Sequence, residues 1–435
     1  MIRDLLIDNV VLADGSKAAV VCHDGLVSQI DPPCAFVSSG FHRRLDGDGG
    51  LLVPSLCHSH IHLDKCDILD KCPLHDGSFE EALRVTGEAK ANFTTDDLIT
   101  RGRNLIQQSV KFGVTAMRAH VEVDDMVKFM CLEAGIQLSK ASTSICDVQI
   151  CAFAQEPIIS HPENAELLHQ ACTLYTPAIS AIGSAPYVEP SDELAVQNVD
   201  LLISLAITHH LHLDFHLDYN LSPSRPPLIH AVIAKLHAAD WTHANPGRTI
   251  VIGHATRLTL FSELECEELR REVGELPVHF IGLPQSDVYM MGRERGSGGR
   301  PRGTLDVLQM QRDGINLNAA LSVNNVGNAF TPQGNGDPLG LCTLGVALYQ
   351  NATPAACQVL LEAVSTRSKA AIGLGYQHEL DTLQPEGPSF GDFPVSFANG
   401  CIQGAVLSPS ETRATVKSGR VVAWRRVSEW DAMSS

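Results

Sequence analysis

Short apolar runs recur along the middle of the chain, and each is followed by polar residues and then by a stretch with helical periodicity. Eight of these runs predict strands: LLVPSLCHSHIH (51–62), GVTAMRAHVEV (113–123), DVQICAFAQE (147–156), AISAIGSAPY (178–187), LHLDFHLDY (211–219), RTIVIGHAT (248–256), PVHFIGLPQSD (277–287) and GINLNAALSVNN (314–325). Between them, segments such as 125–140 and 163–175 place apolar residues at i, i+3 and i+4, which is typical of helices. Eight strands alternating with helices predict an α/β fold, a (β/α)8 TIM barrel.

The two ends of the chain have a different sequence pattern, in which short Val- and Leu-rich runs are separated by Asp-Gly or Ser-Gly turns. We therefore predict that residues 1–54 and 384–435 form a composite β-sandwich domain, and that residues 55–383 form the barrel. The stretch ERGSGGRPRG (294–303) predicts a flexible, solvated loop.

Composition narrows the range of partners. The chain is 44% hydrophobic and 19% charged, as expected for an ordinary globular protein, and its formal net charge of −18 argues against a nucleic-acid partner. No apolar run is long enough to span a membrane, and no signal peptide is evident, so we expect a cytoplasmic protein without a membrane partner. The thirteen cysteines follow no disulfide or zinc-ribbon spacing. We expect a small-molecule partner, and formation of a homo-oligomer stays open.

The predicted strands end in polar residues, and the carboxyl ends of barrel strands are where TIM barrels build their active sites. In HSHIHLDK, His60 and His62 occupy alternate positions and should face one side of an extended strand, with His58 sharing that parity. His216 and His254 end the predicted fifth and sixth strands. Imidazoles from several strands that meet at one barrel mouth are typical of a metal site.

Several segments together resemble the amidohydrolase superfamily, and within it the branch of cytosine deaminase and its relatives. They are PSLCHSHIHLDK, GSFEEALRVTGEAKANFTTDDLITRG, GVTAMRAHVEV, DVQICAFAQEPIISHP, HLDFHLDY, VIGHAT and GDPLG. The resemblance implies that His60, His62 and His216 bind one divalent metal ion, with zinc as the first choice and iron as the alternative. It further implies that His254 acts beside the metal-bound water and that Gln155 contacts the amide-like edge of a cyclic substrate.

The sequence departs from this family at two catalytic positions. Cytosine deaminases have a glutamate three residues after the histidine of the fifth strand, where this chain has Tyr219. After the eighth strand the family has an aspartate that acts as base, and Asn324 is its best match here. An amide does not accept a proton near neutral pH. Asp287, at the end of the seventh predicted strand, is therefore a candidate pocket carboxylate, whereas Asp218 and Asp64 are expected to orient neighbouring ligands.

Three functions follow from these observations. The leading hypothesis is a metal-dependent hydrolase of a C–N bond in a small cyclic amide, imide or amidine, by ring opening or deamination, with cytosine itself a poor substrate. The alternative is a metal-dependent lyase, isomerase or cyclase, because the usual acids are replaced by Tyr219 and Asn324. A ligand-binding relative without catalysis is the third. In each enzymatic case we expect His254, Tyr219 and Asn324 to be catalytic, and Gln155 and Asp287 to bind substrate.

Overall fold

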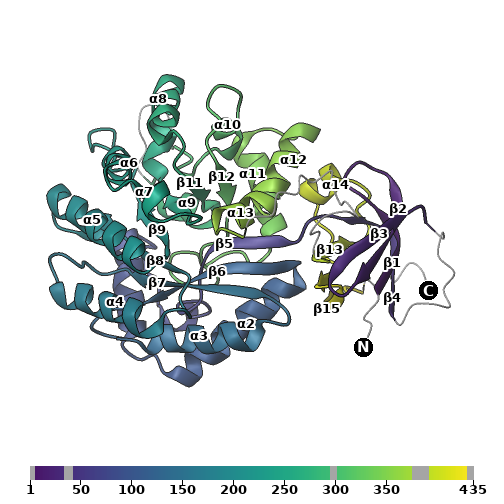
Figure 1. Ribbon diagram of the computed structural model, residues 1–435, viewed down its shortest axis with the longest axis horizontal. Helices are drawn as coiled ribbons and strands as arrows, with labels where there is room; N and C mark the ends of the chain where they lie inside the picture. The colour runs from purple at the N-terminus through teal and green to yellow at the C-terminus, as the bar shows by residue number, and fades with distance from the viewer. Residues whose placement is uncertain (1–4, 34–42, 294–300, 375–390, 429–435) are drawn as a thin grey trace.

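The computed structural model describes residues 5–33, 43–293, 301–374 and 391–428 of the chain. The predicted domain boundary at residue 384 and most of the predicted loop at 294–303 lie outside these residues. The described residues form a large α/β body and a smaller body of strands beside it (Figure 1).

Eight parallel strands form the centre of the large body. Their order in the sheet is their order in the chain: β5 (Leu56–His62), β6 (Val114–Glu122), β7 (Asp147–Ala154), β8 (Ala181–Ser184), β9 (His212–Leu217), β10 (Ile250–His254), β11 (Val278–Gly282) and β12 (Ala319–Leu321). A parallel bridge between Ile61 and Asn324 joins the last strand segment to the first, and the His62 amide donates to the Asn324 carbonyl at 2.8 Å. This bridge closes the sheet, which confirms the predicted TIM barrel.

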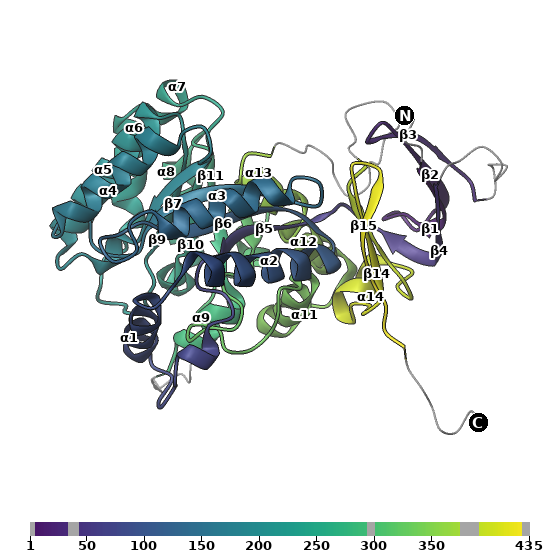
Figure 2. The same cartoon turned by 90° about the horizontal axis from the view of Figure 1, so that it is seen from below.

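Helices cover the outside of the barrel, as both views show (Figures 1 and 2). Their bounds are α1 (Phe79–Lys90), α2 (Thr95–Lys111), α3 (Met130–Ser142), α4 (Pro162–Tyr175), α5 (Asp192–Thr208), α6 (Ile229–Ala238), α7 (Trp241–Ala244), α8 (Glu263–Val273), α9 (Pro284–Met290), α10 (Val307–Met310), α11 (Pro338–Tyr349), α12 (Pro354–Ala363) and α13 (Thr366–Ala371). Strands covered by helices outside and by side chains inside are buried on both faces, which explains their nearly continuous apolar runs. Within the described residues, no helix is long and apolar enough to cross a membrane.

Two predicted elements have different bounds in the structure. The run at 51–62 is divided, because Leu51 and Leu52 end a strand of the smaller body and β5 begins only at Leu56, after Pro54. Proline has no amide proton to donate to a sheet, so it interrupts the strand. The helix predicted from residue 125 starts at Met130, since Lys128 has a positive φ of 49° that a helix does not accommodate.

Both ends of the chain contribute to the smaller body, a β-sandwich that is separate from the barrel (Figure 2). Its strand order is β15 (Arg420–Arg425), β14 (Arg413–Lys417), β13 (Phe393–Ser396), β4 (Arg43–Leu52), β1 (Leu5–Val11), β2 (Lys17–His23) and β3 (Leu26–Asp31), and α14 (Ile402–Leu407) connects β13 to β14. Alternate residues such as Leu5, Ile7 and Val20 build its own apolar core. The prediction that the two termini meet in one β-rich unit is confirmed.

A buried ion pair fastens the β-sandwich to the barrel. Arg413 of β14 is 1% exposed, and its two terminal nitrogens each donate to one oxygen of Asp337 at 2.7 Å. Asp337 caps the first turn of α11 by accepting from the Leu339 amide. The Arg413 guanidinium also donates to the Phe112 carbonyl, at the end of α2. One side chain of the sandwich therefore holds two barrel helices.

Replacing Arg413 with leucine should destabilise the protein by about 3–5 kcal/mol, because the buried Asp337 carboxylate would lose its counter-charge. Denaturant titration followed by circular dichroism measures this loss. Arg425→Leu is the matched control: Arg425 also lies over the Phe112 ring, but it pairs with Glu411, whose side chain is 63% exposed. We expect less than about 1 kcal/mol for the control. Equal losses for the two variants would contradict the assigned role of Arg413.

Candidate functional site

The segment HSHIH of β5 divides its histidines between two faces. The register with β6 shifts between His58 and Ile61, so the alternation of side chains is interrupted there. His60 and His62 point into the barrel, whereas the His58 ring lies 3.1 Å from the Ser109 hydroxyl of α2, on the helix side. The expectation that His58 shares the parity of the other two is therefore wrong, because of this irregularity in the strand.

Four side chains gather inside the barrel beneath its mouth: His60, His120, Asp214 and His216. All four are buried, and one potential ligand atom from each lies within 4.8 Å of the others. The His60 ring is 4.1 Å from the His120 ring and 4.4 Å from the His216 ring, between centroids. His62 lies beside this group, with its centroid 5.2 Å from that of His216. The structure thus brings the three predicted ligands together and adds His120 and Asp214.

Many polar atoms of this group have no hydrogen-bond partner although they are buried. They are both ring nitrogens of His60 and of His120, Nδ1 of His62, Nε2 of His216 and Oδ1 of Asp214. Buried polar atoms are normally satisfied, so a set of unsatisfied ones converging on a small space fits a bound cation. Burial, reinforced by the neighbouring positive groups, lowers the pKa of His60, His62 and His216 well below the usual value. These imidazoles are therefore neutral, the form that binds metal.

The carboxylate of Asp214 also pairs with an arginine inside the barrel. Arg118 donates to Asp214 Oδ2 at 3.2 Å and also to the side chain of Gln149. The other oxygen, Oδ1, lies 3.2 Å from Nε2 of His120 and 3.9 Å from Nδ1 of His60. The Asp214 charge is thus balanced by a buried guanidinium on one oxygen, while the other oxygen faces His60 and His120.

Gly253 explains how the His60 ring fits at this depth. A Cβ atom at Gly253, in β10, would lie 2.9 Å from Cε1 and 3.0 Å from Nδ1 of His60. Contacts this short essentially do not occur. Any larger residue at position 253 would therefore displace the His60 ring. The glycine before His254 therefore makes room for a histidine on another strand.

His254 ends β10 in a left-handed conformation with φ of 66°, and its ring is held by a carboxylate. Nδ1 of His254 donates to Asp287 Oδ1 at 2.8 Å, while Oδ2 of Asp287 accepts from the Thr304 hydroxyl and the Leu283 amide. Burial raises the pKa of Asp287, but these three donors favour its ionised form. Because Nδ1 carries the shared proton, Nε2 of His254 is the ring atom left free to accept one.

The structure places Asp287 behind His254 and not at the end of a strand. The predicted strand at 277–287 stops at Gly282, and Pro284 starts the short helix α9, which carries Asp287. Proline at the first helical position favours this change of conformation. Asp287 is fully buried and does not line the pocket described below.

Tyr219 and Asn324 line the same pocket as His254. The Tyr219 ring lies 3.9 Å from the His254 ring, and its hydroxyl is buried without a hydrogen-bond partner; burial raises its pKa well above the usual value. The side-chain nitrogen of Asn324 donates to Ser286 at 2.7 Å, which leaves its carbonyl oxygen unpartnered. The two residues therefore offer one hydroxyl donor and one amide acceptor where the family has acids.

A small cavity of about 20 Å³ opens beside these residues, at the carboxyl ends of the strands. Its lining combines five of the residues above, His62, His216, Tyr219, His254 and Asn324, with a second set. That second set, which includes the predicted Gln155, comprises Lys65, Phe79, Leu83, Gln155, Tyr187, Asn325 and Phe330. Sequence reasoning missed Lys65, which stands three residues after His62.

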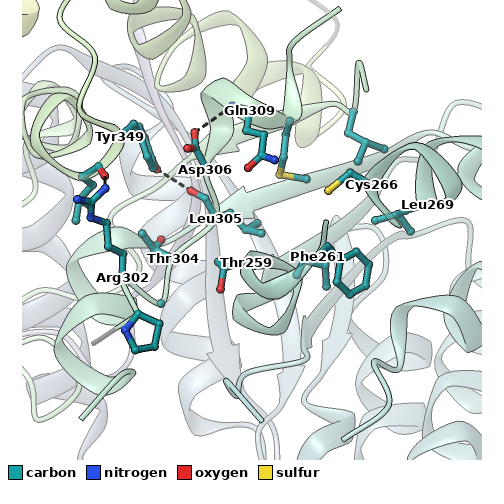
Figure 3. A pocket seen from close by; sticks show the side chains of 16 residues that line it. Thr259, Phe261, Cys266, Leu269, Arg302, Thr304, Leu305, Asp306, Gln309 and Tyr349 are labelled. Atoms are coloured by element: carbon teal, nitrogen blue, oxygen red, sulfur yellow. Dashed lines mark hydrogen bonds between the residues drawn. The ribbon is translucent and has the colours of Figure 1, made fainter. Parts of the chain in front are cut away.

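A larger cavity of about 290 Å³ lies between α8, α10 and α11 (Figure 3). Its wall is both apolar and polar, with Phe261, Cys266 and Leu269 on one side and Tyr349 on the other (Figure 3). Thr304 lines this cavity and also donates to Asp287, so the cavity adjoins the His254–Asp287 pair. The histidine cluster does not reach into this second cavity.

Comparisons with known proteins agree with the fold and the resemblance seen in the sequence. No family model matches the chain. The pterin deaminase of Rhizobium rhizogenes is 24% identical over 325 residues, which cover 74% of this chain and 70% of that protein. The 5-methylcytosine deaminase of Klebsiella pneumoniae, solved with 5-fluorocytosine, has a TM-score of 0.85 at 22% identity and covers 99% of this chain and 100% of that one. The N-isopropylammelide isopropylaminohydrolase of Burkholderia multivorans has a TM-score of 0.78 at 21% identity, covering 97% and 99%.

Proposed function

Because the chain is a relative of the amidohydrolase-superfamily enzymes in the cytosine deaminase-like branch, we propose that it is a metal-dependent hydrolase of a C–N bond in a small ring. The ring would be a cyclic amide, imide or amidine, and the reaction ring opening or deamination. The observation that carries this proposal is the set of unpartnered histidine nitrogens next to the His254–Asp287 pair, at the mouth of the barrel. The relatives named above, two deaminases and an aminohydrolase, support the class of reaction.

His60, His62 and His216 are the ligands that we assign to the ion, with zinc as the first choice and iron as the alternative. The deeper set that replaces His62 by His120 and Asp214 is less suitable, since an ion there would lie close to the Arg118 guanidinium. In our assignment Asp214 stays paired with Arg118 and orients His60 from behind, as carboxylates commonly do for ligating histidines. Three imidazoles with open positions are a usual catalytic arrangement for zinc.

A divalent ion held by these histidines would supply a Lewis acid that makes water nucleophilic near neutral pH. His254 would accept the proton from that water at Nε2, because Asp287 holds the proton on Nδ1. Asp287 would then stabilise the doubly protonated ring by its negative charge. This histidine–carboxylate pair takes over the base function of the missing aspartate.

Tyr219 and Asn324 would form the remaining hydrogen bonds, to the substrate and to the attacking water. A Tyr219 hydroxyl with a raised pKa stays protonated, so it would donate to a ring atom or to the leaving nitrogen. The free carbonyl oxygen of Asn324 would accept from the attacking water and orient it, without removing a proton. Cytosine should be a poor substrate, because the pocket lining within the described residues contains no carboxylate to shuttle protons to its ring.

A non-hydrolytic reaction is the second candidate, and the same lack of a carboxylate in the pocket lining favours it. In that case the ion would polarise a substrate carbonyl, and His254 would move a proton between two substrate atoms in an elimination, isomerisation or cyclisation.

The experiment that tests the proposal is to assay the protein, purified with its metal, against a panel of cyclic amides, imides and amidines in water labelled with oxygen-18. We expect one divalent ion per chain by elemental analysis and one labelled oxygen in the product by mass spectrometry. A product without the label would favour the non-hydrolytic candidate. A protein that holds no divalent metal and converts no ring would instead favour a ligand-binding relative, and rapid release of ammonia from cytosine would refute the predicted selectivity.

A further inference from the structure

The pocket beside the histidines carries a positive charge that the reaction described above does not use. Lys65 lines it, whereas no aspartate or glutamate does within the described residues. The side-chain nitrogen of Lys65 donates to Glu122 at 2.8 Å and approaches the side-chain oxygen of Gln155 at 3.4 Å. The ammonium also lies 5.7 Å from the centre of the Phe330 ring. Lys65 is therefore fixed at the pocket wall and is only 4% exposed.

Glu122 is shared between Lys65 and a second lysine, Lys90, which has further carboxylate partners of its own. Its second oxygen accepts from Lys90 at 2.8 Å, and Lys90 also donates to Asp124 at 2.6 Å. Although burial opposes ionisation, Lys65 and Lys90 lower the pKa of Glu122 to about 2, so it remains a carboxylate. The bond to this carboxylate, which does not itself line the pocket, anchors the Lys65 ammonium, and the interaction with Gln155 uses one further N–H.

Two hydroxyls of the pocket wall are further hydrogen-bond donors, whereas Asn324 and His254, which the proposed reaction uses to hold the water, offer acceptors. Burial raises the pKa of Tyr187 to about 12, against the opposite effect of its hydrogen bond with Gln155, so its hydroxyl keeps a proton. Tyr219 likewise keeps its proton, and its hydroxyl has no partner. Gln155 faces Lys65 with its oxygen. The pocket wall therefore offers a ligand three donors, from Lys65, Tyr187 and Tyr219, besides the two acceptors assigned to the water.

Aromatic side chains complete the wall of the pocket. Phe79 packs edge-on against Tyr219, with centroids 5.4 Å apart, and against Phe330 at 5.9 Å. A flat ligand can stack on such an aromatic wall. The wall thus favours a planar ring, and the hydrogen-bonding groups decide which substituents on that ring are recognised.

We propose that this pocket selects flat heterocycles that carry carbonyl oxygens, with an anionic or partly negative oxygen next to Lys65, in preference to amino-substituted rings of the same size. This inference rests on the proposed function, because it takes the pocket as the substrate site. Oxygen acceptors would satisfy the donors of Lys65, Tyr187 and Tyr219. Amino groups would instead bring further N–H donors against them and leave buried donors unpaired.

The test is isothermal titration calorimetry of the purified, metal-containing protein with two matched probes, the barbiturate anion and 2,4,6-triaminopyrimidine. Both are six-membered rings substituted at the same three positions, one with oxygens and the other with amino groups. We expect barbiturate to bind at least about tenfold more tightly, the effect of one charge-assisted hydrogen bond. Lys65→Met should remove most of this preference, whereas Lys71→Met, at an exposed lysine paired with Asp97, should leave it unchanged.

Variants that remove a single hydroxyl provide a second measurement if Lys65→Met does not fold. Tyr187→Phe should weaken barbiturate several-fold and leave triaminopyrimidine unaffected. Equal or tighter binding of triaminopyrimidine to the unchanged protein would overturn the proposal, as would a preference that survives Lys65→Met. Failure to hydrolyse any ring would count against the proposed function only. Hydrolysis of amino-rich rings together with weak barbiturate binding would refute the selectivity and leave the hydrolase standing.

Discussion

Replacing His60 with alanine is expected to lower the affinity for the divalent ion more than about hundredfold, so that the purified variant carries almost no metal. His60 is the histidine around which the others gather, and both its ring nitrogens lack a hydrogen-bond partner. Removing a group that only orients a ligand already costs about 10–100-fold in metal affinity, and the loss of a ligand should cost more. Elemental analysis after gel filtration measures the metal content directly, whatever the substrate.

His58→Ala is the matched control, two residues away in the same strand. Its ring contacts Ser109 on the helix side, so the variant should keep its full metal content despite some loss of stability. The pair His62→Ala and His120→Ala then decides between the two ligand sets, and we expect the larger loss of metal for His62→Ala. Loss of metal in the His58 variant, or retention in the His60 variant, would show that the ion is bound elsewhere.

Replacing Asp287 with asparagine is expected to reduce turnover by about a thousandfold or more while leaving the metal content unchanged. The amide would no longer stabilise the proton on Nδ1 of His254, and the ring would favour the other tautomer, with Nε2 blocked. Loss of the orienting carboxylate in a serine protease triad has an effect of about 10⁴ for this reason. The turnover number on the best ring of the panel is the measurement, together with its dependence on pH.

Thr304→Val is the control for this variant, because it removes one of the three hydrogen bonds to Asp287 and keeps the carboxylate. We expect a loss of no more than about tenfold, the value of a single hydrogen bond. If Asp287→Asn kept more than a tenth of the turnover, the aspartate would only support the fold, and another group would have to hold the His254 proton.

The barrel could be predicted because strands buried on both faces leave continuous apolar runs, which helix periodicity then separates. The positions of strand ends were harder to predict, since they depend on single residues. Pro54 separates β5 from β4, and Pro284 turns the end of the seventh predicted strand into helix α9. The second of these changes moved Asp287 from the expected pocket wall to a place behind His254, which apolar pattern alone does not reveal.

The histidines of the site could be predicted from the sequence because they stand at the ends of apolar runs. The residues that contact them were harder to predict. Asp214 precedes His216 by two residues, as Arg118 precedes His120, so both pairs share the alternation that marked His60 and His62. That alternation was the signal in the sequence that could have identified Asp214 and Arg118 as neighbours of the histidines. Lys65 gave no such signal, because its place at the pocket depends on Glu122, which lies 57 residues away in the chain.

The bond between Arg413 and Asp337 also has a consequence for the order in which the protein is made. The barrel strands and helices leave the ribosome before β14, which carries Arg413. Until β14 arrives, the newly made barrel holds a carboxylate at the start of α11 without its counter-charge, and the end of α2 lacks a donor for the Phe112 carbonyl. These contacts of α2 and α11 therefore form only after β14 has been synthesised, so two barrel helices depend for part of their stability on a segment that forms none of the barrel strands.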